Sequence, residues 1–132
     1  MTDSPIFTKT YDLMVWLLPV LTRFPKEQRF RLAARIETSL FAFHSLILQA
    51  ARARQRRSLL LEADLELERL RVYLRLAQDV KSLDFKHYAE ASRRVVEVGK
   101  LLGGWLKTTA SPADASAVKR GDGPEAGRVL EQ

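Results

Sequence analysis

The chain has 132 residues, which is enough for one domain that buries an apolar core without disulfides or metal ions. It contains no cysteine, which excludes disulfides, zinc–thiolate sites and cysteine nucleophiles. The formal net charge is +6, the longest apolar run (residues 13–21) is too short to cross a bilayer, and the first residues lack a signal-peptide pattern, so we expect a cytoplasmic protein.

The first predicted helix covers residues 5–23, where apolar side chains recur at helical spacing. Its expected buried seam is Phe7, Tyr11, Met14, Leu18 and Leu21. Pro19 lies inside this segment and lacks the N–H that would bond the carbonyl group of Val15, so we expect a kink or a break there. Pro25 suits the opening of the next helix.

The second predicted helix covers residues 26–54. Its expected buried positions are Leu32, Ile36, Leu40, Phe43, Ile47 and Ala50. It ends in four arginines, Arg52, Arg54, Arg56 and Arg57, and cations at this position complement the negative end of a helix. The cluster is either a second nucleic-acid surface, which we favour slightly, or a well-solvated helix end.

The third predicted helix starts near Ser58, which we expect to cap it, and runs to about Lys81. Its seam alternates spacings of three and four through Leu60, Ala63, Leu67, Leu70, Leu74 and Ala77. Arg71 and Arg75 stand one turn apart on the same side of this helix. Because guanidinium groups stay charged and suit phosphates and carboxylates, this helix indicates a binding surface and not a reaction centre.

The fourth predicted helix covers residues 84–107. One apolar stripe contains Phe85, Tyr88, Ser92, Val95, Gly99, Leu102 and Leu106, and a second contains Ala91, Val98, Leu101 and Trp105. So wide an apolar face suggests contacts with the bundle interior and with a second subunit. Short connections make neighbouring helices antiparallel, so residues 1–108 are predicted to form an all-α, up-down four-helix bundle. Residues 109–132 are poor in large apolar side chains, and we expect a disordered tail.

The positive charge belongs to the predicted bundle. Residues 1–108 hold 19 Lys and Arg against 12 Asp and Glu, a net charge of +7, whereas residues 109–132 hold 3 against 4. Arginine outnumbers lysine fifteen to seven, which favours specific phosphate or carboxylate contacts. Some of these arginines are at helix-pairing distance from a carboxylate, as in Glu27/Arg31 and Arg93/Glu97.

Nothing in the sequence predicts catalysis. Asp84 and His87 have the spacing of half of a di-metal site, but Phe41 stands at the corresponding position before His44. We therefore expect Asp84 to begin a helix, His87 to lie at the surface or an interface, and His44 to be interior. Glycine-rich phosphate loops and serine-nucleophile motifs are absent. No catalytic residue, metal site or cofactor is expected.

Three groups of residues carry a family resemblance. The chain opens with Tyr11-Asp12-Leu13, Trp16-Leu17-Leu18-Pro19 and Phe24-Pro25, continues with Leu70-Arg71-x-x-Leu74-Arg75, and closes its predicted bundle with Gly99-Lys100-Leu101-Leu102-Gly103-Gly104-Trp105-Leu106. Over about residues 5–108 it resembles the Avd (accessory variability determinant) proteins of diversity-generating retroelements. That group is related to the four-helix-bundle proteins encoded in intervening sequences of bacterial 23S ribosomal RNA genes.

The resemblance implies a non-enzymatic partner of a reverse transcriptase, encoded by a bacterium or phage. Such proteins form homopentameric barrels that bind the reverse transcriptase and nucleic acid and support mutagenic copying of a template RNA into cDNA. By position in the motif, Arg71 and Arg75 would engage the polymerase or the RNA. Subunit packing would use Gly99, Leu101, Gly103 and Trp105, although the glycines could equally serve the bundle itself. No membrane or small-molecule partner is implied.

Phosphate contacts from a rigid helix predict binding that is sensitive to salt and weakly selective in sequence. Two rivals stay open at this point. One is a relative of the ribosomal intervening-sequence proteins that has no reverse-transcriptase partner. The other is a purely structural oligomer whose arginines make only salt bridges between subunits.

Overall fold

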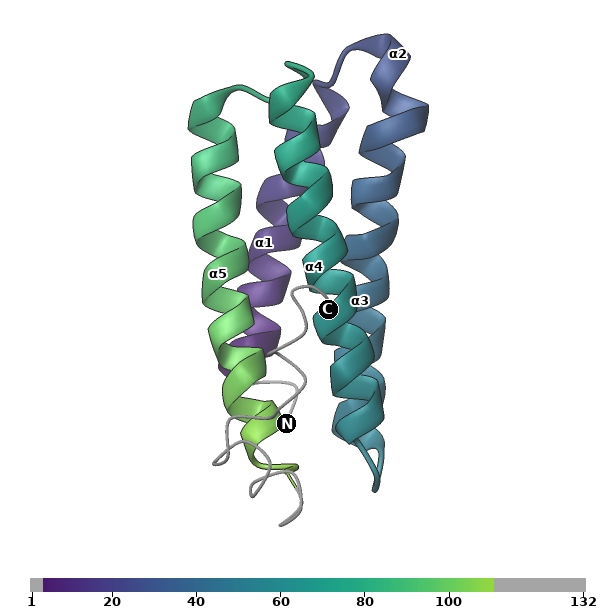
Figure 1. Cartoon of the computed structure of the whole chain (residues 1–132), viewed down its shortest axis with the longest axis vertical. Coiled ribbons are helices and arrows are strands. Elements are labelled where there is room, and N and C mark those ends of the chain that lie inside the picture. Colours follow the sequence, from purple (N-terminus) through teal and green to yellow (C-terminus); the bar gives the residue numbers. More distant parts are fainter. Residues whose placement is uncertain (1–3, 111–132) are drawn as a thin grey trace, which may run out of the picture.

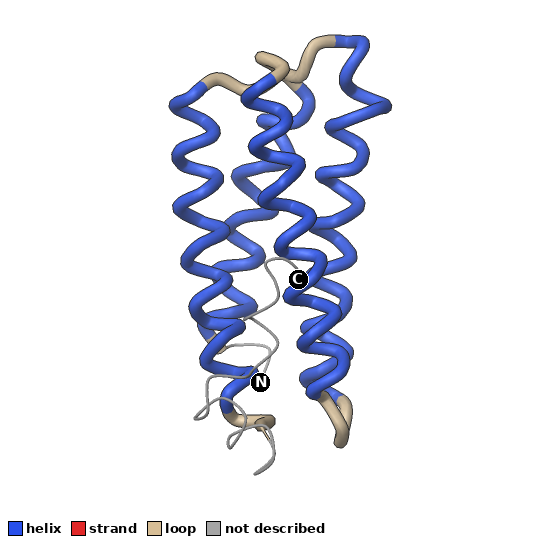
Figure 2. The backbone as a smooth tube through the Cα atoms, in the orientation of Figure 1, coloured by secondary structure: helices blue, strands red, loops and turns tan. Residues whose placement is uncertain are grey.

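The computed structural model describes residues 4–110, and within them every regular element is a helix (Figures 1 and 2). The elements are α1 (Pro5–Thr22), α2 (Lys26–Gln28), the π-helical segment η1 (Arg29–Ala33), α3 (Ala34–Arg52), α4 (Arg57–Asp79) and α5 (Phe85–Lys107). Since α2, η1 and α3 follow one another without a break, they form one long helix. The prediction of an all-α four-helix bundle is confirmed. From residue 111 onward, the expected tail lies outside the described residues.

The four long helices run up, down, up and down along the bundle (Figure 1). The helix that contains α3 packs against α4, α4 packs against α5, and α1 completes the bundle by packing against both α5 and α3. Short connections at residues 23–25, 53–56 and 80–84 join them. The connections are too short for a parallel return, so successive helices are antiparallel as predicted.

The core confirms two of the predicted seams completely. On α4 all six expected residues are at most 1% exposed, and on the second long helix all six are at most 5% exposed. On both helices the apolar residues at alternating spacings of three and four form the stripe that faces the core, although each helix also carries exposed apolar residues outside that stripe.

The seam predicted for α1 is wrong in part. Phe7 and Leu21 are buried, but Tyr11 is 63% exposed, and Met14 and Leu18 are only half-buried. The buried face instead consists of Ile6, Phe7, Thr10, Leu13, Leu17, Val20 and Leu21. Because α1 is apolar on most of its sides, two stripes satisfy helical spacing, and the contacts with α3 and α5 select between them.

Helix ends differ from expectation at three points. α1 continues through Pro19 to Thr22, which excludes a break there, while a kink at Pro19 stays a prediction. Ser58 is not a cap, because α4 begins one residue earlier at Arg57. Phe85, expected in the α5 seam, is 70% exposed, since it is the first residue of α5 and lies at the end of the bundle. The buried residues of α5 are Ala91, Val95, Val98 and Leu102, drawn from both predicted stripes.

Candidate functional site

Arg71 lies across the contact between α4 and α5. Its side chain is 40% exposed, and Nη1 donates a hydrogen bond of 3.0 Å to Oε1 of Glu68, one turn earlier on α4. Nη2 lies over Gly99 of α5, only 2.5 Å from the point where a Cβ atom on that residue would stand. The guanidinium group therefore occupies space that the side chain of any other residue at position 99 would take.

The two glycines that sequence analysis grouped together have different surroundings. At Gly99 an added Cβ would meet Arg71 and, at 3.5 Å, a methyl group of Leu67. At Gly103 an added Cβ would meet no heavy atom within 4 Å. Within the chain, Gly99 therefore leaves room for the Arg71 side chain, and its expected role between subunits stays a prediction. A role for Gly103 between subunits stays a prediction.

Arg75 is exposed and makes no hydrogen bond or ion pair with the described part of the chain. It lies one turn beyond Arg71 on the flank of α4 that faces α5. The predicted pair thus combines one arginine that is oriented by Glu68 and Gly99 with one whose guanidinium group is available to a partner.

The basic cluster at residues 52–57 lies at the connection between α3 and α4, and the structure divides it into two kinds of arginine. Nη2 of Arg56 donates to the carbonyl group of Ala53 at 2.9 Å. Nη1 of Arg57 donates to Oγ1 of Thr109 at 3.3 Å, just past the end of α5. These two arginines join chain segments at this end of the bundle. Arg52 and Arg54, by contrast, are exposed to solvent.

The structure does not bring the 52–57 cluster together with Arg71 and Arg75. Arg57 and Arg71 are fourteen residues apart on one straight helix, which corresponds to about 20 Å along its axis. A single ligand that contacts both groups must therefore be an extended polymer or a large protein surface.

The residues expected between subunits lie near the C-terminal end of α5. Leu101 and Trp105 are half-buried, and the Trp105 ring meets the edge of Phe7 with centroids 6.1 Å apart. With Ser4, Pro5 and Ile6 they line a small hollow of about 250 Å³ between the start of α1 and the end of α5. Each side chain is thus partly used within the bundle, and their role in an oligomer stays a prediction.

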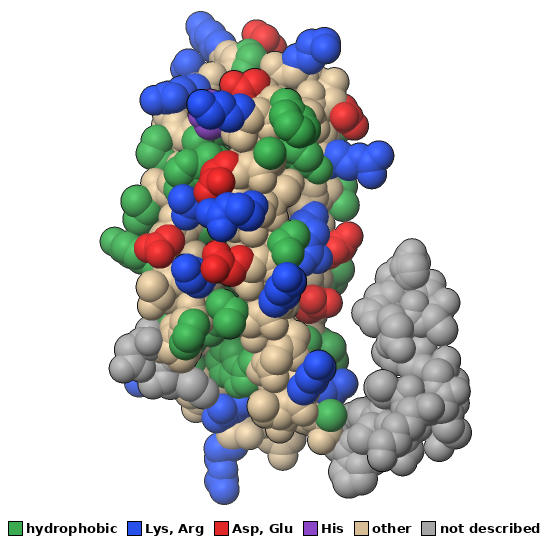
Figure 3. Space-filling view, turned by 90° about the vertical axis from the view of Figure 1, so that its left-hand side faces the viewer, with side chains coloured by type: hydrophobic (Ala, Val, Ile, Leu, Met, Phe, Trp, Pro, Cys, Tyr) green, Lys and Arg blue, Asp and Glu red, His purple; other side chains and the backbone are tan. Residues whose placement is uncertain are grey.

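The two arginines of α5, Arg93 and Arg94, form ion pairs within the chain. Glu90 accepts hydrogen bonds from Arg93 and Arg94, each at 2.7 Å, and these bonds, that from Arg93 above all, lower its pKa to about 2. Arg94 also lies over the Trp16 ring, 5.3 Å from its centroid. The expected pair of Arg93 with Glu97 forms at 4.0 Å. On the face shown in Figure 3, acidic and basic side chains are interspersed.

The surroundings of the two histidines are those of structural residues in the bundle. Oδ1 of Asp84 accepts a hydrogen bond of 2.8 Å from the backbone N–H of His87, which confirms Asp84 as the residue that caps α5. This bond also keeps the pKa of Asp84 below its ordinary value. The His87 ring stacks on Trp16 with centroids 6.2 Å apart. His44, expected in the interior, is half-buried.

A groove that the sequence did not predict lies between the start of the second long helix and the end of α4. We call it the η1–α4 groove; it has a volume of about 670 Å³ and is lined by Gln28, Phe30, Arg31, Leu32, Arg35, Tyr73, Leu76 and Val80. The expected pair of Glu27 with Arg31 is not among the ion pairs of residues 4–110, and Arg31 instead lines the groove. The signal that points to this groove is the pair Arg31/Arg35, which repeats the spacing of Arg71/Arg75.

Two further features bear on the kind of protein. In residues 4–110 no helix combines the length and the apolar character that crossing a membrane requires. In the same residues no three His, Asp or Glu side chains are grouped so that they could hold a metal ion.

The fold and its exposed arginines define the class first: an all-helical bundle whose recognisable chemistry is that of a binding surface. A family model described as bAvd-like matches residues 5–109. The chain therefore belongs to the bAvd-like family, which confirms its resemblance to the Avd proteins of diversity-generating retroelements. No curated protein and no solved structure matches the chain.

Proposed function

We propose that this chain is a non-enzymatic accessory subunit of a diversity-generating retroelement. It binds the reverse transcriptase and the template RNA or cDNA through a basic helical surface and so supports mutagenic reverse transcription. The observation that carries the proposal is the family match over residues 5–109. Members of this family are accessory, generally non-catalytic proteins. Such a subunit acts in the cytoplasm, where the polymerase meets its template.

The proposed contact surface is the α5 flank of α4, which bears Arg71 and Arg75. Arg75 is exposed and offers its guanidinium group to a phosphate or a carboxylate. Arg71, which pairs with Glu68 and lies over Gly99, adds a second guanidinium group one turn away. Arg52 and Arg54 form a separate basic area at the other end of α4 and extend the proposed surface for a long polyanion.

A homopentamer, as the resemblance implies, repeats this surface around a ring. Five weak patches then act on one RNA with an effective concentration set by their spacing, which raises affinity without new contacts. Gly99, Leu101, Gly103 and Trp105 are the proposed subunit contacts, and Gly99 also leaves room for the Arg71 side chain. Light scattering of the purified chain measures the subunit number directly.

The test is co-purification with the reverse transcriptase from the same locus, at low and moderate salt. The variants are Arg75→Ala, Arg71→Ala and the double variant, with Arg93→Ala as a control that removes an exposed arginine paired with Glu90. We expect the double variant to keep its helicity and oligomeric state but to lose the partner, and the control to behave as wild type.

Two results contradict the proposal. If the wild-type chain is folded and oligomeric yet binds neither the polymerase nor RNA at low salt, a ribosomal intervening-sequence type of protein or a purely structural oligomer becomes the better explanation. If the double variant loses helicity, the arginine pair is structural. RNA binding that barely changes between low and moderate salt would exclude phosphate contacts as the source of affinity.

A further inference from the structure

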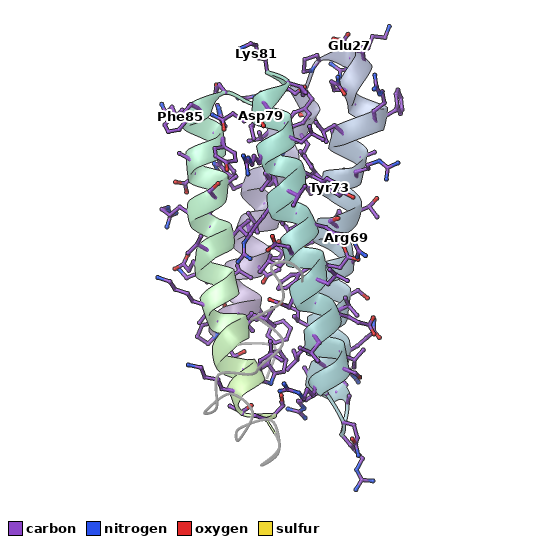
Figure 4. The ribbon with its side chains drawn as sticks, in the orientation of Figure 1. Glu27, Arg69, Tyr73, Asp79, Lys81 and Phe85 are labelled. Atoms are coloured by element: carbon purple, nitrogen blue, oxygen red, sulfur yellow. The ribbon has the colours of Figure 1, made fainter. Side chains whose placement is uncertain are left out.

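The η1–α4 groove exposes apolar side chains that the bundle does not use. Phe30 is 87% exposed, and Leu76 and Val80 are each about half-exposed along the last turns of α4. Figure 4 shows Tyr73 on the side of α4 that faces α3, at the same end of the bundle. Contiguous apolar groups exposed at one place mark an interaction site more often than an isolated residue does.

The apolar surface continues beyond the groove along the outward face of α4. Leu61, Leu65 and Val72, which precede Leu76 and Val80 on α4, are also about half-exposed. Neighbouring members of this series are separated by one or two helical turns. A nucleic-acid ligand gains little from such aliphatic side chains, whereas a helix or loop of a protein partner can bury them.

The charge of the groove specifies the partner further. Arg31 and Arg35 are exposed, stand one turn apart, and make no ion pair within residues 4–110. None of the residues that line the groove is a carboxylate. Two unpaired guanidinium groups beside aromatic and aliphatic side chains are complementary to an apolar segment flanked by Asp or Glu.

The π-helical backbone of η1 also supports a binding role for the η1–α4 groove. The five residues Arg29–Ala33 are π-helical, and such a segment inside a longer helix occurs frequently at functional sites. Here it leaves Leu32 and Ala33 in the core while the neighbouring Phe30 and Arg31 both face solvent. The aromatic anchor and the first cation of the groove thus come from one turn.

We propose that the η1–α4 groove docks an acidic, amphipathic helix of the reverse transcriptase. This inference rests on the proposed function, because it takes the polymerase as the partner. The apolar side of that helix packs on Phe30, Leu76 and Val80, and its carboxylates meet Arg31 and Arg35. A second copy of this chain is the rival occupant, and the subunit number of the groove variants tests for it.

The experiment measures the affinity of the co-expressed reverse transcriptase for groove variants by biolayer interferometry. Phe30→Ala and Leu76→Ala remove apolar contacts without changing charge. The matched control is Phe85→Ala, which deletes another exposed aromatic at the same end of the bundle but on α5, away from Tyr73 (Figure 4). We expect each groove variant to weaken binding at least about tenfold, as for an interface anchor, and the control to bind as wild type.

A further variant reverses the charge of the groove by combining Arg31→Glu with Arg35→Glu. This double variant should reduce polymerase binding most strongly at low salt. Circular dichroism and light scattering accompany every variant; a change of subunit number in Phe30→Ala would identify the groove as a subunit interface and overturn the inference. A labelled single-stranded RNA is the second probe. If Phe30→Ala weakens RNA binding and leaves polymerase binding intact, the groove is a base-stacking surface, and the inference is wrong.

The failure of this inference is distinguishable from failure of the proposed function. If wild-type chain binds the polymerase and all groove variants bind equally well, the groove is not the docking site, while the accessory role stands. If the wild-type chain does not bind the polymerase at all, the proposed function itself fails, and the inference fails with it.

Discussion

Gly99→Ala tests the contact between α4 and α5 in a way that separates two opposite effects. Replacing a glycine in the interior of a helix by alanine stabilises that helix by about 1 kcal/mol, because alanine loses less backbone freedom on folding. The new Cβ atom, however, would stand 2.5 Å from Nη2 of Arg71, so the guanidinium group must move.

The cost of moving Arg71 is small for a structural reason. The clashing atom is the far end of a flexible side chain that is 40% exposed, so it can turn into solvent. What is lost is an exposed ion pair with Glu68, which contributes about 0.5 kcal/mol or less, and some packing over α5. We therefore expect Gly99→Ala to raise the free energy of unfolding by roughly 0.5 kcal/mol.

The assay is urea unfolding of four proteins: wild type, Gly99→Ala, Arg71→Ala and the double variant. In the Arg71→Ala background the clash is absent, so the full helix gain of about 1 kcal/mol should appear. The difference between the two backgrounds is the energy of the contact between Arg71 and Gly99. A loss of stability greater than about 1 kcal/mol in Gly99→Ala alone, or equal effects in both backgrounds, would refute this account of the glycine.

Three further predictions concern stability alone. Thr10→Val should stabilise the chain by up to about 1 kcal/mol in urea unfolding, because Oγ1 of Thr10 is buried without a hydrogen-bond partner among the described residues. Lys81→Gly should raise the melting temperature, since Lys81 has φ of 64°, a left-handed conformation that costs other residues about 1 kcal/mol relative to glycine; an unchanged or lower value would contradict this reasoning. The pKa of Glu90 is lowered to about 2, so its ion pairs should stabilise the fold above the unfolded pKa of 4.5 and be lost as the pH falls toward 2. Glu90→Gln should flatten the stability profile over that interval, and a profile identical to that of wild type would exclude the effect.

Periodicity predicts the parts of this fold in which one apolar seam is unbroken along a helix. The seams of α4 and of the second long helix were predicted residue by residue, because in each the apolar residues recur at spacings of three and four over the whole length of the seam. In α1 the same reasoning selected Tyr11 instead of Leu13, because the helix is apolar on most sides and only its two neighbours decide which side is buried. The presence of a helix is thus a local property, whereas its rotation about its own axis is a tertiary one.

The candidate site shows the same division. That Arg71 and Arg75 share a flank of one helix follows from their spacing. That Arg71 lies over Gly99 depends on the register of α4 against α5, which no local pattern contains. The η1–α4 groove was missed for a related reason: it lies where the start of the second long helix meets the end of α4, and no local pattern contains that contact.

One helix therefore offers two flanks, and their independence can be measured. Arg75 lies on the α5 flank of α4, whereas Tyr73 and Leu76 lie on the flank that faces α3. The first flank is proposed to contact RNA or polymerase and the second to contact the polymerase, so Arg75→Ala should lower RNA affinity, whereas Phe30→Ala should lower polymerase affinity and leave RNA affinity unchanged. In the double variant Arg75→Ala with Phe30→Ala, the loss of polymerase affinity should equal the sum of the losses of polymerase affinity in the two single variants within about 0.5 kcal/mol, since distant sites act additively. A smaller combined loss would mean that both residues contact the same partner on one continuous surface around the end of α4.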